Sequence, residues 1–495
     1  MPRQTSLYLI VIGAFMLFIS GNFLSEGLSR VGMDNAVVSQ RMAEGFEDFW
    51  LPSMNNESSP DRLNYLPLGY WLEGVWYRMF GDNSFMAEKV YSVLTYIILA
   101  FLVICIWRMA GQSEKTGWLP LLCWISIPLV SWSATNNLLE STMTIFVLLS
   151  VLFLLKAYRA AFIVKSRHAA GKQGGAFRWE RTLWIVLSAC MMELAFMVKG
   201  VMGLFPVFFP FLYWLMVRRE RVVVPIVNTL IIVVVWIVTV FAVIVFSVDI
   251  YGHLYNYLHR QLIGGLLHVQ TVASHFFIVY ALLRQAVIPL IIIVVLALIR
   301  IKQRPVYIYL LHRRNRKRLT ADQRYRARMG WFYFTLACSG VLPIMFGLKQ
   351  QEFYLVPILP FFAIAMACLL YELVEDWISR IGKTAQHVLA GLAIVVFVSG
   401  LILNISSIHK INSNYELLSD MKIILPCLGE GECVGASSEI IENPEVTDYF
   451  YRYKNITFDT SVGHRHILTM YGKITDTGYT CMELPTVRYH LYEAR

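Results

Sequence analysis

Charged residues are scarce in this sequence. Asp, Glu, Lys and Arg make up 15% of its 495 residues, whereas the AVILMFWYC set makes up 57%. Soluble proteins average about 25% charged residues. So large an apolar fraction exceeds what the core of a soluble enzyme can bury, and it excludes a disordered chain. The composition therefore predicts a membrane protein with several spans, and we ascribe the net charge of +10 to topology rather than to nucleic-acid binding.

The sequence also lacks the common motifs of nucleotide and metal chemistry. It has no Walker loop, dinucleotide fingerprint, HExxH helix or Cys/His zinc spacing. The histidines of residues 248–275 match no standard ligand spacing, so we expect them to pack at the membrane interface. They are His253, His259, His268 and His275.

Long apolar runs fill most of residues 1–405. A hydrocarbon core about 30 Å thick needs about 20 apolar residues per helix, so these runs predict about eleven crossings. Basic runs at 159–181, 218–221 and 300–328 are expected in the cytoplasm, which places the N-terminus inside and the chain after about residue 406 outside. The apolar runs lie at 6–23, 87–107, 118–133, 138–157, 182–198, 201–217, 222–247, 276–299, 331–347, 353–373 and 386–405.

Residues 24–86 form the longest loop expected outside the membrane, and part of this loop has a helical pattern. Apolar side chains recur at spacings of three and four between Pro67 and Gly81, with proline at the first helical position and glycine after the end. A helix over 67–80 is too short to span, so we expect it to lie along the membrane surface. Packing against the helical bundle is the alternative.

Residues 406–495 differ in composition from the rest of the chain. Short alternating runs at 421–425 and 455–460, together with many charges, indicate a small extracytoplasmic α/β domain. The predicted fold is thus an all-α polytopic membrane domain, 1–405, followed by this domain. Three cysteines fall in it, so one disulfide is expected, and its pairing stays open. They are Cys427, Cys433 and Cys481.

Ionisable residues gather at the outer ends of the apolar helices. A charge at the edge of the hydrocarbon is costly unless it is paired or hydrated, so such residues are functional candidates by default. Alone, each carboxylate could cap a helix and each lysine could reach the interface. Together they suit a substrate with an apolar tail in the bilayer and an anionic head at the outer surface. They are Asp34, Glu140, Lys199, Arg260 and Lys349.

Several motifs in chain order give a more specific resemblance. They are Asp34 after the first apolar run, Pro67-Leu68-Gly69-Tyr70-Trp71, Glu140 before Ser141-Thr142, Leu194-Ala195-Phe196-Met197-Val198-Lys199-Gly200, and Lys349 and Tyr354 before Pro357 and Pro360. With these motifs, residues 5–405 resemble the C-type glycosyltransferases that use polyprenyl-phosphate sugars. The lipid A aminoarabinose transferase and protein O-mannosyltransferase families are the most similar.

Two departures from the aminoarabinose transferases concern the substrate. Those enzymes have Glu-Lys-Pro before the Pro-Leu-Gly-Tyr-Trp segment, with the Lys expected at the donor phosphate and the Glu linked to a metal. This chain has Asn64-Tyr65-Leu66, so a divalent metal has only weak support as a cofactor. The second acid is Glu140 where Asp is usual. Phosphate contacts are then expected from Lys199, Arg260, Lys349 or Arg62.

The resemblance implies transfer of a sugar from a polyprenyl-phosphate donor to a lipid, glycan or protein acceptor. The expected place is the periplasmic face of a bacterial inner membrane, and membrane lipids are the remaining partner. We expect Asp34 to act as general base and Glu140 to orient the acceptor or to hold the cations in register. Contacts with the lipid and the sugar are expected from Tyr65, Tyr70, Trp71 and Tyr354.

Two other classes of function compete with sugar transfer. A transporter or flippase for a lipid-linked sugar would also place polar residues in apolar helices, but such sites usually lie near the midplane between inverted repeats. A membrane scaffold that recruits partners through its outer domain would leave Asp34 and Glu140 unexplained.

Overall fold

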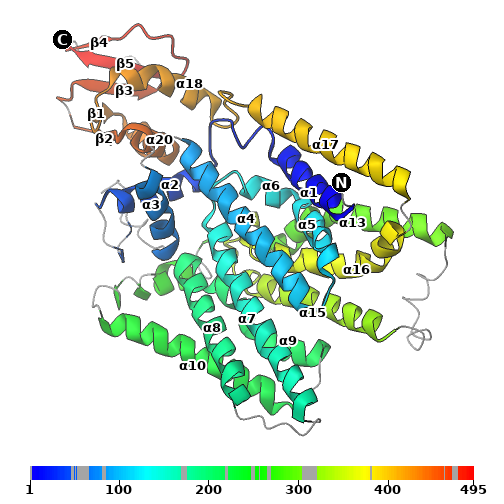
Figure 1. Cartoon of the computed structure of the whole chain (residues 1–495). Coiled ribbons are helices and arrows are strands. Elements are labelled where there is room, and N and C mark those ends of the chain that lie inside the picture. Colours follow the sequence, from blue (N-terminus) through cyan, green and yellow to red (C-terminus); the bar gives the residue numbers. More distant parts are fainter. Residues whose placement is uncertain are drawn as a thin grey trace. The chain divides into compact units, whose positions relative to one another are not determined.

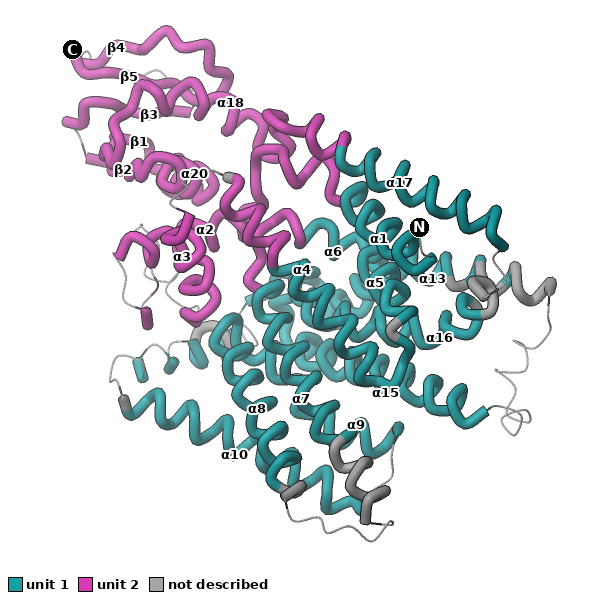
Figure 2. Tube along the Cα trace, viewed as in Figure 1, with its two compact units in different colours: residues 1–18, 95–133, 140–401 teal, residues 19–94, 134–139, 402–495 magenta. Residues whose placement is uncertain are grey.

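Figure 1 shows the computed structural model, which is helical apart from one sheet near the C-terminus. The chain forms two compact units, drawn in different colours in Figure 2. The first contains residues 1–18, 95–133 and 140–401, and the second contains residues 19–94, 134–139 and 402–495. The structure describes residues 3–45, 49–50, 52, 66–80, 85–168, 176–217, 221–246, 251–252, 254–255, 257–264, 269–303, 320–379, 382–461, 463–470 and 478–495.

The first unit is built from apolar helices of different lengths, of which α1, α4, α7 and α17 have residues in both units. They are α1 (Arg3–Ile19), α4 (Phe85–Met109), α5 (Trp118–Ile125), α6 (Pro128–Ser133), α7 (Leu139–His168), α8 (Ala176–Lys199), α9 (Phe209–Met216), α10 (Val223–Phe246), α13 (Phe277–Gln303), α15 (Ala321–Ile344), α16 (Leu359–Ser379) and α17 (Lys383–Ile405). Shorter helical turns connect them: η2 (Glu114–Thr116), η3 (Val201–Phe208), the π-helical η4 (Tyr257–Ile263) and η6 (Glu352–Leu355).

Each predicted apolar run is mainly helical over its described residues, which confirms the polytopic helical fold. The run 118–133 is divided into α5 and α6 before Pro128, because proline lacks the backbone N–H that would continue a helix. Among the described residues, five helices are long and apolar enough to cross a membrane: α4, α7, α8, α10 and α17. Shorter apolar helices lie at Arg3–Ile19, Val201–Met216, Phe277–Ile292 and Leu359–Glu372. The full number of crossings stays a prediction.

Burial within this unit distinguishes a central helix from peripheral ones. The apolar window of α7 is 72% buried, whereas the windows of α10 and α17 are 11% and 17% buried. Apolar side chains left bare over the length of a helix need an apolar surrounding, and lipid tails provide one. The chain is therefore a multi-pass membrane protein, and α7 is the most buried of its candidate spans.

The second unit begins with two helices that pack against each other. They are α2 (Arg30–Glu44), capped by Ser29, and α3 (Leu68–Phe80). The helix predicted over 67–80 is thus present, with Pro67 just before its first residue. Its polar side, with Glu73 and Tyr77, is buried, while Trp71 is 41% exposed. Because Gly74 has no side chain, α3 approaches α2 closely: a Cβ there would lie 2.8 Å from the carbonyl oxygen of Ser39.

The C-terminal part of the second unit is a small α/β fold. Its five strands have the order β2-β1-β3-β5-β4, with β1 parallel to β2 and β3, and β5 antiparallel to β3 and β4. The strands are β1 (Cys433–Ala436), β2 (Thr457–Asp459), β3 (His466–Met470), β4 (Tyr479–Cys481) and β5 (Tyr489–Ala494). The helices are α18 (Tyr415–Ile424), η7 (Leu425–Cys427), α19 (Ser438–Ile441) and α20 (Pro444–Lys454).

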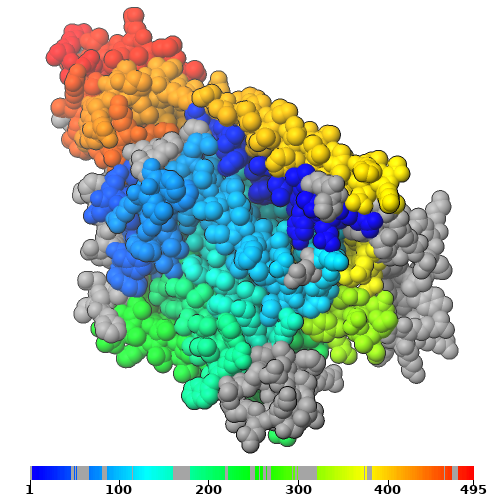
Figure 3. Space-filling model, in the orientation of Figure 1, coloured from blue at the N-terminus to red at the C-terminus, as the bar shows by residue number. Residues whose placement is uncertain are grey.

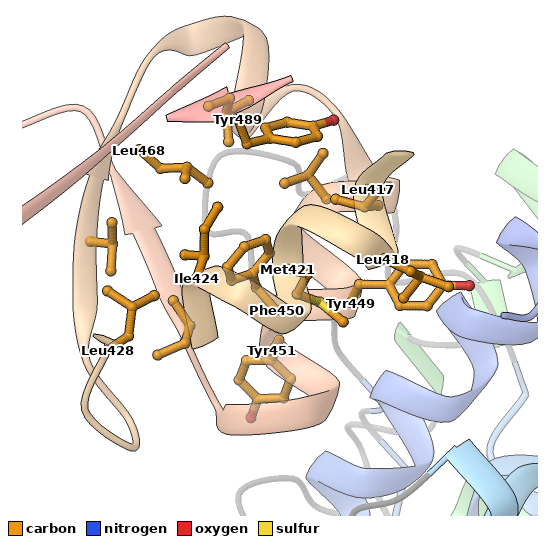
Figure 4. Close-up of a cluster of buried hydrophobic side chains, with 14 of the residues drawn as sticks. Leu417, Leu418, Met421, Ile424, Leu428, Tyr449, Phe450, Tyr451, Leu468 and Tyr489 are labelled. Atoms are coloured by element: carbon orange, nitrogen blue, oxygen red, sulfur yellow. The ribbon is translucent and has the colours of Figure 1, made fainter. Parts of the chain in front are cut away.

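Two local predictions for this region are wrong. The run 421–425 lies mainly in α18, because Leu417, Met421 and Ile424 recur at helical spacing and form one buried face, shown in Figure 4. All eight cysteines lie in described segments and all are free, so the expected disulfide is not formed. The alternating run 455–460 contains the strand β2.

One hydrophobic core joins the two ends of the chain within this unit. Leu28, Met33, Ala36 and Val37 are buried with the side chains of the C-terminal fold, and the Tyr449 hydroxyl accepts a hydrogen bond from the Leu28 N–H (2.8 Å). Figure 3 shows the blue N-terminal and orange C-terminal segments of this unit on one face. Helix α2, which carries Asp34, is thus held by residues more than 400 positions further along the chain.

Candidate active site

Glu140 lies in the first turn of α7 and faces Lys199, the last residue of α8. Lys199 Nζ is 3.5 Å from Glu140 Oε1, and the side chains are 12% and 0% exposed. Neither carboxylate oxygen of Glu140 accepts a hydrogen bond within the described part of the chain. A helix N-terminus favours an anion and a helix C-terminus favours a cation, so both helix dipoles support the pair. A buried carboxylate still able to accept hydrogen bonds is suited to bind a polar ligand.

The junction after Lys199 has a conformation that only glycine adopts readily. Gly200 has a φ of 83° and a ψ of −151°, and a Cβ on it would lie 1.6 Å from the hydroxyl oxygen of Tyr257. The same hydroxyl accepts a hydrogen bond from the Val201 N–H (3.4 Å). Tyr257 begins the π-helical turn η4, which also contains Arg260. The end of α8 is therefore set by a contact with the segment that carries another predicted phosphate ligand.

Lys349 lies in the turn between α15 and η6, and the adjacent Gln350 holds this turn. Gln350 is 1% exposed, and its side chain accepts a hydrogen bond from the Ile278 N–H and donates to the carbonyl oxygens of His275 and Gly347. Partial burial and the nearby charge of Lys199 lower the pKa of Lys349. The structure thus brings Glu140, Lys199 and Lys349 into one neighbourhood of the first unit.

Asp34 lies in the second turn of α2, in the second unit. Its Oδ1 is buried and makes no hydrogen bond to any described residue. The residues on either side are fixed to the link 134–139. Asn35 donates to the Asn137 carbonyl (3.0 Å), and a Cβ on Gly32 would lie 2.1 Å from the Asn136 carbonyl oxygen. An unsatisfied buried carboxylate oxygen is uncommon in native proteins, which keeps Asp34 as a candidate for direct chemistry.

The remaining predicted site residues have different environments. Tyr70 is buried on α3 (2% exposed), whereas Trp71 on the same helix is partly exposed and contacts the Phe49 ring edge-on. Tyr354 lies in η6, partly buried and edge-on to Phe353. The backbone of Arg260 is described, but its side chain is not, and Arg62 and Tyr65 lie outside the described residues.

Glu73 of α3 is a buried acidic residue that the sequence pattern does not mark as part of the site. Its carboxylate is fully buried and accepts hydrogen bonds from Ser39 (2.8 Å), Asn137 (2.6 Å) and Tyr77. Burial raises the pKa of Glu73 from 4.5 to about 7. The sequence signal was present but ambiguous, because an acidic residue on the polar side of a short amphipathic helix more often faces water.

The described residues do not fit a metal ion. No group of three or more His, Cys, Asp and Glu side chains among them is placed to bind one. Of the histidines in residues 248–275, His259 and His275 are described; both are exposed, and His275 Nδ1 contacts the Met345 carbonyl (2.9 Å). His253 and His268 lie outside the described residues.

These features define a multi-pass membrane protein with a buried carboxylate–lysine site at the ends of its apolar helices. Residues 64–263 match the family model described as dolichyl-phosphate-mannose-protein mannosyltransferase. Two crystal structures of ArnT from Cupriavidus metallidurans have the same fold. The apo structure has a TM-score of 0.60 at 12% identity, covering 97% of this chain and 95% of that chain. The structure bound to undecaprenyl phosphate has a TM-score of 0.58 at 12% identity, covering 98% and 97%.

The match over nearly the full length of both chains shows the fold, and the family model matches the part that contains α3, Glu140 and Lys199. No curated protein is significantly similar to the chain in sequence. Together these findings confirm the resemblance to the C-type membrane glycosyltransferases.

Proposed function

We propose that this protein transfers a sugar from a polyprenyl-phosphate-linked donor to a lipid, glycan or protein acceptor at the outer face of a bacterial inner membrane. The observation that carries the proposal is the buried Glu140–Lys199 pair with Lys349 nearby, in a chain with the ArnT fold. A cationic group beside a carboxylate that can still accept hydrogen bonds suits an anionic lipid headgroup next to a hydroxyl acceptor.

The proposed reaction needs neither a nucleotide nor a covalent enzyme intermediate. The acceptor oxygen attacks the anomeric carbon, the bond from that carbon to the phosphate oxygen breaks, and polyprenyl phosphate leaves with the bonding electron pair. The acceptor proton passes to a carboxylate. Positive charge grows on the sugar ring and negative charge on the departing phosphate, so fixed cations stabilise the transition state, each by about 3 kcal/mol when well placed.

Each candidate residue has a part in this scheme. Asp34 is the general base, since one of its oxygens is buried without a hydrogen bond and can take the acceptor proton. Lys199 and Lys349 hold the phosphate, and Glu140 keeps Lys199 in place through the ion pair. Arg260 and Arg62 are further candidates for phosphate contact. Tyr65, Tyr70, Trp71 and Tyr354 are candidates for contact with the lipid or sugar.

The test is a donor-turnover assay on purified protein with Asp34→Asn. The enzyme is offered a mixture of polyprenyl-phosphate sugars and acceptor extract, and the lipid fraction is analysed by mass spectrometry. We expect the wild type to consume one donor and release free polyprenyl phosphate, and Asp34→Asn to lose at least about 10²-fold of that rate. The matched control is Asp322→Asn, an exposed aspartate in the first turn of α15, which should retain the wild-type rate.

Two other outcomes have definite meanings. Full activity in Asp34→Asn would remove Asp34 from the chemistry while leaving the reaction class intact. If the wild type consumes no donor in the presence of acceptor extracts, sugar transfer is wrong. Donor flux across proteoliposomes would then establish the flippase alternative.

A further inference from the structure

A buried polar cluster lies beside Asp34 in the second unit, and none of its members touches the reacting atoms in the scheme above. Its centre is the Glu73 carboxylate on α3, which is 0% exposed. Donors from three different segments converge on it: Ser39 of α2, Tyr77 of α3 itself, and Asn137 of the link 134–139. A carboxylate that accepts three hydrogen bonds in the protein interior holds its donors more firmly than a neutral acceptor does.

Asn137 connects the Glu73 carboxylate to the part of α2 that contains Asp34. Its side-chain N–H₂ donates both to Glu73 (2.6 Å) and to the Gly32 carbonyl (3.3 Å), and its own carbonyl accepts from Asn35 (3.0 Å). Asp34 lies between Gly32 and Asn35 in the chain. Asn137 has a φ of 51°, a conformation that costs free energy unless its surroundings hold it.

The same link leads directly into α7. Asn136 accepts a hydrogen bond from the Ser29 N–H (2.8 Å), which ties the link to the N-cap of α2. Asn137 is followed by only two residues before Glu140, and α7 begins at Leu139. A displacement of the link therefore moves Leu139, the first residue of α7, as well as the first turns of α2.

We propose that Glu73 is a positioning residue for the transfer reaction: its buried carboxylate holds the link 134–139 against the first turns of α2, so that Asp34 keeps its place. This inference rests on the proposed function for its kinetic consequence, because Asp34 is the carboxylate assigned as general base. Its structural consequence is independent of that function.

The charged groups around Glu73 affect the pH at which its hydrogen bond to Asn137 changes. Tyr77 lies on the same helix, Glu88 on α4 and Arg452 on α20, with the Arg452 guanidinium 4.8 Å from the Tyr77 ring centre and its Nε 2.5 Å from Glu88 Oε1. Burial and the charge of Glu88 both raise the pKa of Glu73, to about 7. Protonation near neutral pH turns one oxygen into a donor and weakens the hold on Asn137.

The kinetic test uses Glu73→Gln, Asn137→Ala and the double variant, with Glu439→Gln as control. Glu439 is an exposed glutamate of the same unit. Polyprenyl-phosphate release is measured as kcat and KM at pH 6 and pH 8. We expect the wild-type kcat to be roughly threefold to tenfold higher at pH 8 than at pH 6, and Glu73→Gln to keep the low value at both. The double variant should be no slower than the slower single variant, because both changes break the same link.

A purely structural role for Glu73 gives a different pattern. Thermal melting in detergent would then shift in Glu73→Gln while kcat per folded molecule and its pH profile stayed those of Glu439→Gln. That result would overturn the proposal. The proposal would also be wrong if the effects of Glu73→Gln and Asn137→Ala on kcat were fully additive in the double variant.

Hydrogen exchange gives a readout that needs no turnover. After correction for intrinsic rates, amides of residues 29–35 and 134–139 should lose protection between pH 6 and pH 8 in the wild type, because ionisation of the buried carboxylate favours any opening that exposes it to water. They should not change in Glu73→Gln. If the wild type releases no polyprenyl phosphate from any donor, the transfer reaction fails, and the exchange data alone then decide the role of Glu73. If amide protection depended on pH equally in the wild type and in Glu73→Gln, the inference would be wrong.

Discussion

The Glu140–Lys199 pair combines a binding role with a cost to stability. Two buried charges 3.5 Å apart attract each other, but removing both from water offsets most of that attraction. Because neither oxygen of Glu140 accepts a hydrogen bond from the described residues, the pair adds little to the free energy of unfolding. This imbalance is expected where a bound ligand completes the site.

Charge removal at this pair should separate stability from activity. Lys199→Met leaves Glu140 buried without its cation, so we expect the free energy of unfolding to fall by about 3–5 kcal/mol. The double variant Lys199→Met/Glu140→Gln should regain most of that loss, because no unpaired charge remains, yet donor turnover should stay low. Thermal melting in detergent and polyprenyl-phosphate release measure the two quantities. Recovery of turnover together with stability would mean that the pair is structural.

A second prediction at this scale concerns the pH dependence of stability at Glu73. Because burial raises its pKa from 4.5 to about 7, ionisation costs folding free energy. The contribution of Glu73 is complete below about pH 4.5 and is lost as the pH rises through about 7. The shift corresponds to about 3 kcal/mol at alkaline pH. Glu73→Gln should therefore gain stability relative to the wild type between pH 5 and pH 8, as measured by thermal melting at each pH. A constant difference across that range would show that Glu73 does not titrate there.

At the scale of elements, helix ends determine where the candidate side chains lie. Helix α8 ends at Lys199 because Gly200 turns the chain in a conformation that a residue with a Cβ rarely adopts. The Tyr257 side chain fills the space where a Cβ on Gly200 would lie, and its hydroxyl accepts a hydrogen bond from the Val201 N–H. The place of the Lys199 ammonium group therefore depends on a residue of a different segment.

Gly200→Ala should disturb both the backbone and this contact. The strained conformation alone costs about 1–3 kcal/mol for a residue other than glycine, and the new Cβ would overlap the Tyr257 ring. We expect loss of stability and at least a tenfold rise in KM for the donor, since Lys199 is moved. The control is Gly391→Ala in α17, where a Cβ meets nothing within 4 Å and ordinary helix propensity favours alanine. Comparable effects of both substitutions would contradict this account.

Across the whole molecule, the core of the second unit depends on both ends of the chain. Leu28, Met33, Ala36 and Val37 bury their side chains among residues of the C-terminal fold. Arg452 of α20, 1% exposed, pairs with Glu88 of α4 and donates to Gln40 of α2. The C-terminal residues therefore support the helix that carries Asp34 rather than only following it in the chain.

Truncation after residue 405 tests this dependence. Without residues 406–495 the apolar face of α2 would be bare and Glu88 would lose its buried partner, so we expect the remaining chain to insert in the membrane but to have no donor turnover. Restoring the missing part as a separately expressed fragment should recover some activity if it folds. A truncated protein with wild-type turnover would show that α2 does not need this core.

The extent to which sequence predicted this protein differs between fold and site. The apolar runs and the helix over 67–80 were found from composition and periodicity, because helices in lipid must satisfy their own backbone hydrogen bonds and so follow local sequence. The run 421–425, which alternates in sequence, lies mainly in helix α18, and five residues are too few to distinguish the strand period from the helix period. Glu73 was missed, since the burial of one face of α3 depends on α2, which is distant in the sequence.

The sequence by itself determined that the chain spans a membrane many times, which residues bear charge near the ends of its helices, and which family it resembles. These properties depend on local runs of residue types and on motif order. Only the tertiary structure decided that Lys199 pairs with Glu140, that Gln350 and Tyr257 set the neighbouring turns, and that Glu73 joins α3 to the link before α7. Those contacts join residues that are 56 to 72 positions apart in the chain. Such pairings depend on how helices pack rather than on any short stretch of sequence.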